Sequence, residues 1–95
     1  MAKLSQDELA AGLGRLPGWR QEGDEIARTY ELPDFRTALA FVAYVGELAE
    51  HANHHPDVDI RYNKVRLGLA THSEGGLTEK DLALARKIDR VESSG

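Results

Sequence analysis

Apolar residues recur at two different periods along the chain, and each period predicts a different kind of element. A spacing of three or four residues runs from residue 35 to about His54, after Asp34, which is a good N-terminal helix cap. The same spacing predicts a short first helix over residues 5–13 and a last helix that opens at Thr78. The apolar stripe of the long central helix includes Phe35, Leu39, Val42, Gly46 and Ala49.

Strict alternation of apolar and polar residues follows Pro56 and predicts a β-hairpin. A tight turn at Asn63 and Lys64 would bring apolar residues of the two strands together: Tyr62 with Val65, Ile60 with Leu67 and Val58 with Leu69. Continued past Pro56, this register would place His55 opposite His72.

A looser alternation between Trp19 and Leu32 surrounds the turn-forming stretch EGDE and predicts an earlier hairpin. The resulting order, αββαββα, predicts an α+β fold in which three helices pack on one face of a four-stranded antiparallel sheet. With 95 residues the chain is long enough for one domain, covering residues 1–95, whose last residues from about 92 to 95 form a frayed tail.

Composition excludes several classes of function. The 12 Lys and Arg residues and 16 Asp and Glu residues are interspersed and give a net charge of -4, so we expect no direct nucleic-acid partner. The absence of cysteine excludes disulfides, thiolate metal sites and cysteine nucleophiles. We find no signal-peptide pattern and no apolar run long enough for a membrane helix, so we expect a cytoplasmic protein without a membrane partner.

Three of the four histidines lie close together where the helical period ends. The residue before a proline is disfavoured in a helix, so His55 should lie at or beyond the helix end. Imidazole has an unperturbed pKa of about 6.5 and can both donate and accept a proton near neutral pH. His54, His55 and His72 could therefore supply the acid and base that addition or removal of water requires. Glu50 lies one helical turn before His54 and could orient that ring.

Two simpler interpretations compete with catalysis. His51 and His55 have the spacing of helical zinc ligands, but the glutamate of the zinc-protease motif is missing and the helix should end near His55, so we predict no metal site. Histidines at a helix C-terminus also interact favourably with the helix dipole, and this surface role is the simpler interpretation of His51. Trp19 and Tyr30 fit a core or interface better than a ligand-stacking role.

The stretch EHANHHPDVDIRYNKVRLGLATH, followed by GGLTEKDLALA, resembles the pterin-4a-carbinolamine dehydratase family, some of whose animal members are also dimerisation cofactors. The resemblance covers nearly the whole chain. It implies a hydro-lyase that converts 4a-hydroxytetrahydropterin to quinonoid dihydropterin and water, as in recycling of the tetrahydrobiopterin-type cofactor of aromatic amino acid hydroxylases. It further implies that the pterin is the substrate, that no metal or organic cofactor is needed, and that the chain forms a homodimer or homotetramer.

The resemblance also implies the site residues. His54, His55 and His72 match the catalytic positions, and Glu50 and Asp81 match acidic positions that support them. The implied substrate-binding residues are His54, His55, Pro56, Thr71, His72, Ser73 and Glu74. Our hypothesis gives the acid and base roles to His55 and His72, in an order that the sequence leaves open, while His54 binds and orients the pterin. The alternative is a non-catalytic interaction, assembly or dimerisation-cofactor module that retains the pterin pocket.

Overall fold

The computed structural model describes residues 2–94 and contains three α-helices and a four-stranded antiparallel sheet. In chain order the elements are α1 (Gln6–Leu13), β1 (Arg20–Glu22), β2 (Glu25–Glu31), α2 (Phe35–Ala52), β3 (Asp57–Arg61), β4 (Lys64–Leu69) and α3 (Glu79–Ser94). A short 3₁₀ helix, η1 (His72–Glu74), lies between β4 and α3. The predicted α+β class and the predicted order of helices and strands are confirmed. No helix within residues 2–94 combines the length and the apolar character needed to cross a bilayer.

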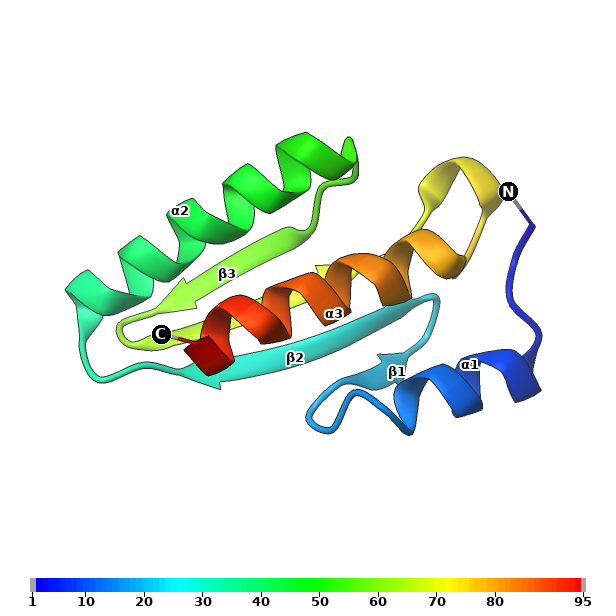
Figure 1. The fold of residues 1–95 in the computed structure, drawn as a ribbon, viewed down its shortest axis with the longest axis horizontal. Helices are drawn as coiled ribbons and strands as arrows, with labels where there is room; N and C mark the ends of the chain where they lie inside the picture. Colours follow the sequence, from blue (N-terminus) through cyan, green and yellow to red (C-terminus); the bar gives the residue numbers. More distant parts are fainter. Residues whose placement is uncertain (1, 95) are drawn as a thin grey trace.

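The sheet has the strand order β1-β2-β4-β3, so β1 and β3 are its edges. Figure 1 shows α2 and α3 lying across one face of the sheet, with α1 beside the β1 end. Strand side chains alternate between the two faces, and those that point toward the helices include the fully buried Ile26, Val65, Leu67 and Leu69. The opposite face carries charged side chains, among them Glu22, Asp59 and Arg66.

The helical side of the core is supplied mainly by α2 and α3. Their buried residues include Phe41 and Val45 from α2 and Leu84, Ala85 and Ile88 from α3. The first helix approaches α3 closely, because a Cβ atom added to Gly12 would lie 2.5 Å from Cδ1 of Leu82. A side chain at position 12 would therefore require the Leu82 side chain or one of the two helices to shift.

Local capping explains where the first two helices begin and where α2 ends. Ser5 and Glu8 form a capping box, in which Ser5 Oγ accepts from the Glu8 N–H at 3.1 Å and Glu8 Oε1 accepts from the Ser5 N–H at 2.8 Å. The carboxylate of Asp34 accepts from the Thr37 N–H at 2.8 Å, as its predicted capping role requires. Asn53 adopts a left-handed conformation with φ 50° and ends α2 before the histidine pair.

Asp89, on α3, accepts hydrogen bonds from three side chains through a single oxygen. Its Oδ1 accepts from Trp19 Nε1 at 3.0 Å, from an Arg28 guanidinium nitrogen at 2.9 Å and from the Tyr30 hydroxyl at 2.5 Å. Burial raises the pKa of the Tyr30 phenol far above its usual range, and its hydrogen bond to Asp89 acts in the same direction. The expectation that Trp19 and Tyr30 belong to the core is confirmed, since both are buried.

The predicted register of the second hairpin is wrong by two residues. Val58 pairs with Leu67 rather than Leu69, because the turn is formed by Tyr62 and Asn63 and not by Asn63 and Lys64. Tyr62 takes a left-handed conformation with φ 55°. The Asn63 side chain and carbonyl bond the backbone of residue 32, which fixes the position of the turn. A shift of two keeps every side chain on its predicted face.

Two details at helix surfaces also differ from expectation. Phe35 and Leu39 belong to the predicted apolar stripe of α2 but are 46% and 45% exposed, and the buried residues of α2 are Ala38, Phe41, Val45 and Ala49. The last helix extends through residue 94, whereas a frayed tail was predicted from about residue 92. An ion pair between Arg28 and Glu92, at 3.7 Å, holds this last part of α3 against β2.

Candidate active site

The left-handed end of α2 sends two consecutive histidines to opposite environments. After Asn53 the chain leaves the helix, and the backbone N–H of His54 donates to the carbonyl of Ala49 at 3.1 Å. The imidazole of His54 is then buried, with 10% of its side chain exposed, whereas 56% of the His55 side chain is exposed. This confirms that His55 lies beyond the helix.

Glu50 orients His55 and not His54. One of its carboxylate oxygens lies 2.5 Å from Nε2 of His55, and both side chains are largely exposed. The expectation that Glu50 would orient His54 by helical spacing is wrong, because the backbone leaves the helix at Asn53 and rotates the next residue away from the Glu50 face. Glu50 thus has a histidine partner, as a supporting role requires.

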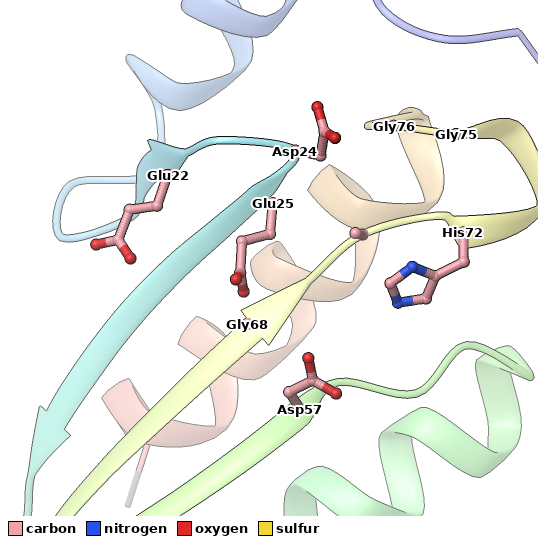
Figure 2. A pocket seen from close by; sticks show the side chains of 9 residues that line it. Glu22, Asp24, Glu25, Asp57, Gly68, His72, Gly75 and Gly76 are labelled. Atoms are coloured by element: carbon pink, nitrogen blue, oxygen red, sulfur yellow. The ribbon is translucent and has the colours of Figure 1, made fainter.

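His72 lies beside a hollow of about 280 Å³ on the open face of the sheet. Figure 2 shows its ring and the carboxylates of Glu25 and Asp57 around the same space. The remaining lining residues are Glu22, Asp24, Gly68, Ala70, Gly75 and Gly76. Among the residues that the structure describes, Oε1 of Glu25 is buried without a hydrogen-bond partner. A Cβ atom on Gly68 would come within 1.9 Å of that oxygen, so a larger residue here would displace the Glu25 carboxylate.

The charge of this hollow is mainly negative. The Arg66 guanidinium, which donates to Glu22 at 2.6 Å, lowers the pKa of the Glu22 carboxyl, so this group is ionised at neutral pH. The same guanidinium lies 3.8 Å from the second oxygen of Glu25. Arg66 therefore offsets part of the negative charge next to the hollow.

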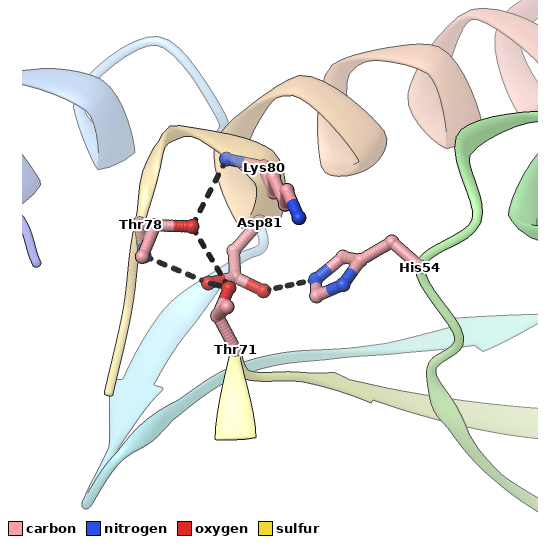
Figure 3. A network of polar contacts seen from close by, with 5 residues as sticks. All are labelled: His54, Thr71, Thr78, Lys80 and Asp81. Carbon is pink, nitrogen blue, oxygen red and sulfur yellow. Dashed lines mark hydrogen bonds and ion pairs between the residues drawn. The ribbon is translucent and has the colours of Figure 1, made fainter. Parts of the chain in front are cut away.

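A buried carboxylate, Asp81, connects the two histidine-bearing segments (Figure 3). Its Oδ1 lies 2.6 Å from Nε2 of His54. Its Oδ2 accepts from the Thr71 hydroxyl and from the Thr78 N–H, each at 2.9 Å. The Asp81 side chain is fully buried, so these contacts replace its solvation. The predicted opening of the last helix by Thr78 is confirmed, since Thr78 Oγ1 accepts from the N–H of Lys80 at 3.2 Å, in the first turn of α3.

The predicted site residues are brought together in part. His54, Thr71 and Asp81 form the buried network, and η1 contains His72 with the exposed Ser73 and Glu74. Glu50, His55 and Pro56 line a second groove of about 490 Å³, between α2 and β3. His55 and His72 therefore lie beside different hollows, and they are not opposed in the β3–β4 ladder, which ends at the pairing of residues 57 and 68.

Thr78 belongs to the Asp81 network, although the sequence did not identify it as a site residue. The available signal was its position three residues before Asp81, which indicates a helix cap but not a link to Thr71. The hydroxyl oxygens of Thr71 and Thr78 lie 2.8 Å apart. The fourth histidine, His51, is exposed and lies near Lys87 and Arg90, outside this network. Over the described part of the chain, no group of three or more histidine or acidic side chains is placed to hold a metal ion.

Comparison with known proteins identifies the family. Residues 2–91 match the family model described as Pterin 4 alpha carbinolamine dehydratase. The chain belongs to this family. The histidine pair, the His72 segment and Asp81 all lie within the matched part of the pterin-4-alpha-carbinolamine dehydratase family model.

Sequence relatives cover nearly the whole length of the chain. A protein of Chloroflexus aurantiacus is 56% identical over 91 residues, which is 96% of this chain and 98% of the relative. A protein of Thermomicrobium roseum is 53% identical over 93 residues, or 98% of this chain and 100% of the relative. Both carry the name "Putative pterin-4-alpha-carbinolamine dehydratase".

Solved structures agree with the fold. A crystal structure of a transcriptional coactivator/pterin dehydratase from Brucella melitensis is 38% identical and superposes with a TM-score of 0.90, covering 94% of this chain and 97% of that one. A pterin dehydratase-like protein described as a RuBisCO assembly factor shares the fold at 21% identity and a TM-score of 0.65, covering 77% of this chain and 87% of that one. This chain is therefore similar to the pterin-4-alpha-carbinolamine dehydratase family in both sequence and fold.

Proposed function

We propose that this chain dehydrates 4a-hydroxytetrahydropterin to quinonoid dihydropterin, with His55 and His72 as its acid and base. Membership of a pterin dehydratase family supports the type of reaction. The observation that carries the proposal is that Asp81 ties the segment of His55 to the segment of His72 while both of these rings stay exposed. Neither imidazole ring is buried in the core, so both are accessible to a small molecule.

The reaction requires one proton to be given and one to be taken. An imidazolium donates a proton to the hydroxyl on carbon 4a, and the carbon–oxygen bond breaks to release water. A neutral imidazole removes the proton from the adjacent ring nitrogen, and that nitrogen–hydrogen electron pair forms the carbon–nitrogen double bond. Each such proton transfer typically contributes about 10²–10⁴-fold to the rate. No redox step takes place, and we expect no metal or organic cofactor.

The surrounding side chains suit a small polar heterocycle. Glu50 holds Nε2 of His55 and leaves the Nδ1 side of the ring for substrate. Pro56 lines the same groove as His55, and Ser73 and Glu74 accompany His72 on η1. Polar carboxylates on the open face, including Glu25 and Asp57, can accept hydrogen bonds from the N–H groups of a pterin.

A coupled assay tests this proposal directly. An aromatic amino acid hydroxylase generates the 4a-hydroxypterin, whose absorbance decay is followed with and without this protein. We expect the wild-type chain to accelerate the decay and the double variant His55→Ala, His72→Ala to lose the acceleration. His51→Ala is the matched control, since it removes an exposed histidine outside the network and should keep the wild-type rate. Folded wild-type protein without any acceleration would refute the proposed reaction.

We further propose that the chain acts as a homodimer or homotetramer. Five large apolar side chains on α2, β3 and the following turn are exposed: Phe35 46%, Leu39 45%, Tyr44 63%, Val58 43% and Tyr62 68%. The rings of Phe35 and Tyr62 stack at 6.5 Å, and β3 is an edge strand. A surface of this kind favours association. Sedimentation equilibrium should show a dimer or tetramer for wild type and a smaller species for Leu39→Glu, and a wild-type monomer at micromolar concentration would contradict the proposal.

The same exposed surface favours a second candidate function, in which the chain serves as an interaction or assembly module that retains the pocket. The coupled assay separates the two candidates, because a pure interaction module would not accelerate dehydration.

For the enzymatic candidate, the physiological source of substrate would be a pterin-dependent aromatic amino acid hydroxylase in the cytoplasm.

A further inference from the structure

Two pairs of consecutive residues in the site divide their side chains between the interior and the surface. In the first pair His54 is buried and His55 is exposed, and in the second pair Thr71 is buried and His72 is exposed. The two buried members meet at the same carboxylate, one on each oxygen of Asp81. The Asp81 carboxylate therefore links the two backbone segments that carry the exposed histidines.

We propose that Thr71 and Thr78 are positioning residues that hold the Asp81 carboxylate, and through it the relative placement of His55 and His72. Thr71 then acts below the site, where its hydroxyl is hydrogen-bonded to Asp81 and Thr78. Thr78 is a further residue of this supporting network. The kinetic part of this inference rests on the proposed dehydratase function. The structural part does not.

The donors and acceptors of the network have only one consistent order. An aspartate carboxylate accepts on both oxygens, so the Thr71 hydroxyl gives its one proton to Oδ2 of Asp81. The hydrogen bond between the two threonines must then be donated by Thr78. The Thr78 oxygen in turn accepts from the backbone N–H of Lys80, which belongs to the first turn of α3. The chain of donors thus starts on a rigid helix and ends on the carboxylate.

The same order determines which nitrogen of His54 carries a proton. Oδ1 of Asp81 is the acceptor of the 2.6 Å contact, so Nε2 of His54 must be the donor. A ring held at Nε2 leaves Nδ1 as its second polar atom, and it fixes the loop that continues into His55. The backbone N–H of Thr78 donates a second hydrogen bond to Oδ2 of Asp81. Because this donor belongs to the backbone, its position does not depend on the rotamer of the Thr78 side chain.

The test combines kinetics with a spectroscopic signal. Thr71→Val and Thr78→Val keep the side-chain shape and remove one hydroxyl each, whereas Thr71→Ser and Thr78→Ser keep the hydroxyl. Tyr30→Phe is the matched control, because it removes one hydroxyl donor from Asp89, a carboxylate on the same helix outside the site. For each folded variant we would measure kcat, KM and the downfield proton NMR signal of His54 Nε2–H, assigned by its loss in His54→Gln.

We expect both valine variants to lose about tenfold or more in kcat with a smaller change in KM, since misplacement of reacting groups by about 1 Å can cost about 10²-fold. The His54 signal should weaken or disappear in them because its proton exchanges faster. Both serine variants and Tyr30→Phe should keep the wild-type signal and kcat.

Valine variants that keep kcat within twofold of wild type, or that lose kcat while the His54 signal is unchanged, would overturn the inference. Failure of the serine variants to restore activity would overturn it as well. If the wild-type protein has no dehydratase activity, the proposed function fails, and the NMR signal alone then decides whether the threonines hold Asp81.

Discussion

Asp81 and Asp89 are two carboxylates on the same helix, and each accepts hydrogen bonds from three donors. Asp81 receives an imidazole, a hydroxyl and a backbone N–H, shared between its two oxygens. Asp89 receives an indole, a guanidinium and a phenol on one oxygen. The Asp81 side chain is fully buried, and 19% of the Asp89 side chain is exposed.

The two carboxylates differ in the surroundings of the residues that donate hydrogen bonds to them. The partners of Asp89 also pack against one another, since Trp19 meets Tyr30 edge-on at 6.3 Å and the Arg28 guanidinium lies 4.3 Å from the centre of the Tyr30 ring. The side-chain partners of Asp81 are instead neighbours in sequence of exposed histidines. Two carboxylates on the same helix therefore have different roles. Asp89 stabilises the packing of the core, and Asp81 connects the segments of the candidate site.

The largest expected effect is on catalysis, at Asp81. In Asp81→Asn an amide NH₂ must face either the His54 N–H or the donors on Oδ2, so one set of hydrogen bonds is lost. We expect kcat to fall by about 10²-fold or more, as for misplaced reacting groups. Asp89→Asn should keep kcat within about threefold per folded molecule, because its partners lie outside the site. Equal losses of kcat in the two variants would remove the distinction between the two carboxylates.

The second effect is on stability, and here the two carboxylates should behave alike. Hydrogen bonds to charged groups contribute about 1.5–3 kcal/mol each, and an amide still accepts some of them, so we expect each variant to lose about 2 kcal/mol of unfolding free energy. Urea denaturation measures this loss. A variant at Asp89 with wild-type stability would show that this network does not fasten the core.

A smaller effect is expected at Glu50, the exposed counterpart of Asp81. Glu50→Gln keeps the side-chain length but weakens the contact with His55. Surface pairs of this kind contribute little to stability, so the urea midpoint should stay close to that of wild type. We expect kcat to fall by about threefold to tenfold, because the orientation of His55 is only partly lost. A loss as large as that of Asp81→Asn would make the exposed carboxylate the principal support of the site.

The smallest effect concerns pH and lies at the cap of α2. Hydrogen bonds from Thr37 lower the pKa of Asp34, so the unfolded chain takes up a proton at higher pH than the folded chain does. The contribution of Asp34 is therefore present above the unfolded value of about 4 and is lost as the pH falls through the lower folded value. Asp34→Asn keeps a capping side chain but cannot titrate. Its unfolding free energy should fall less steeply between about pH 5 and pH 2 than that of wild type, and parallel curves would contradict the assignment.

Local patterns predicted the elements of this fold because each element is encoded locally. The caps at Ser5 and Asp34, the break before Pro56 and the change of period all act over a few residues. The register was not encoded in this way, since Asn63 is held by the backbone of Leu32, which is far away in the sequence. The error left the core prediction intact because a shift by two residues preserves the faces.

Sequence spacing did not predict how the candidate site residues are arranged. Sequence spacing predicted a contact between Glu50 and His54. The left-handed conformation of Asn53 places His55 against Glu50 instead. Resemblance named Asp81 as a supporting residue, but its contacts with Thr71 and His54 depend on the approach of the β4 end and of the α2 end to α3. Contacts between segments distant in the sequence leave no local signal.

The central claim is that His55 and His72 serve one pterin although they lie beside different hollows. The most direct test is a titration of the protein with an unreactive reduced pterin, such as 7,8-dihydropterin, followed through the imidazole ring NMR signals of the histidines. We predict that the signals of His55 and His72 shift together with a single dissociation constant while those of His51 stay in place. A shift of only one of the two, or of neither at saturating pterin, would contradict a shared site.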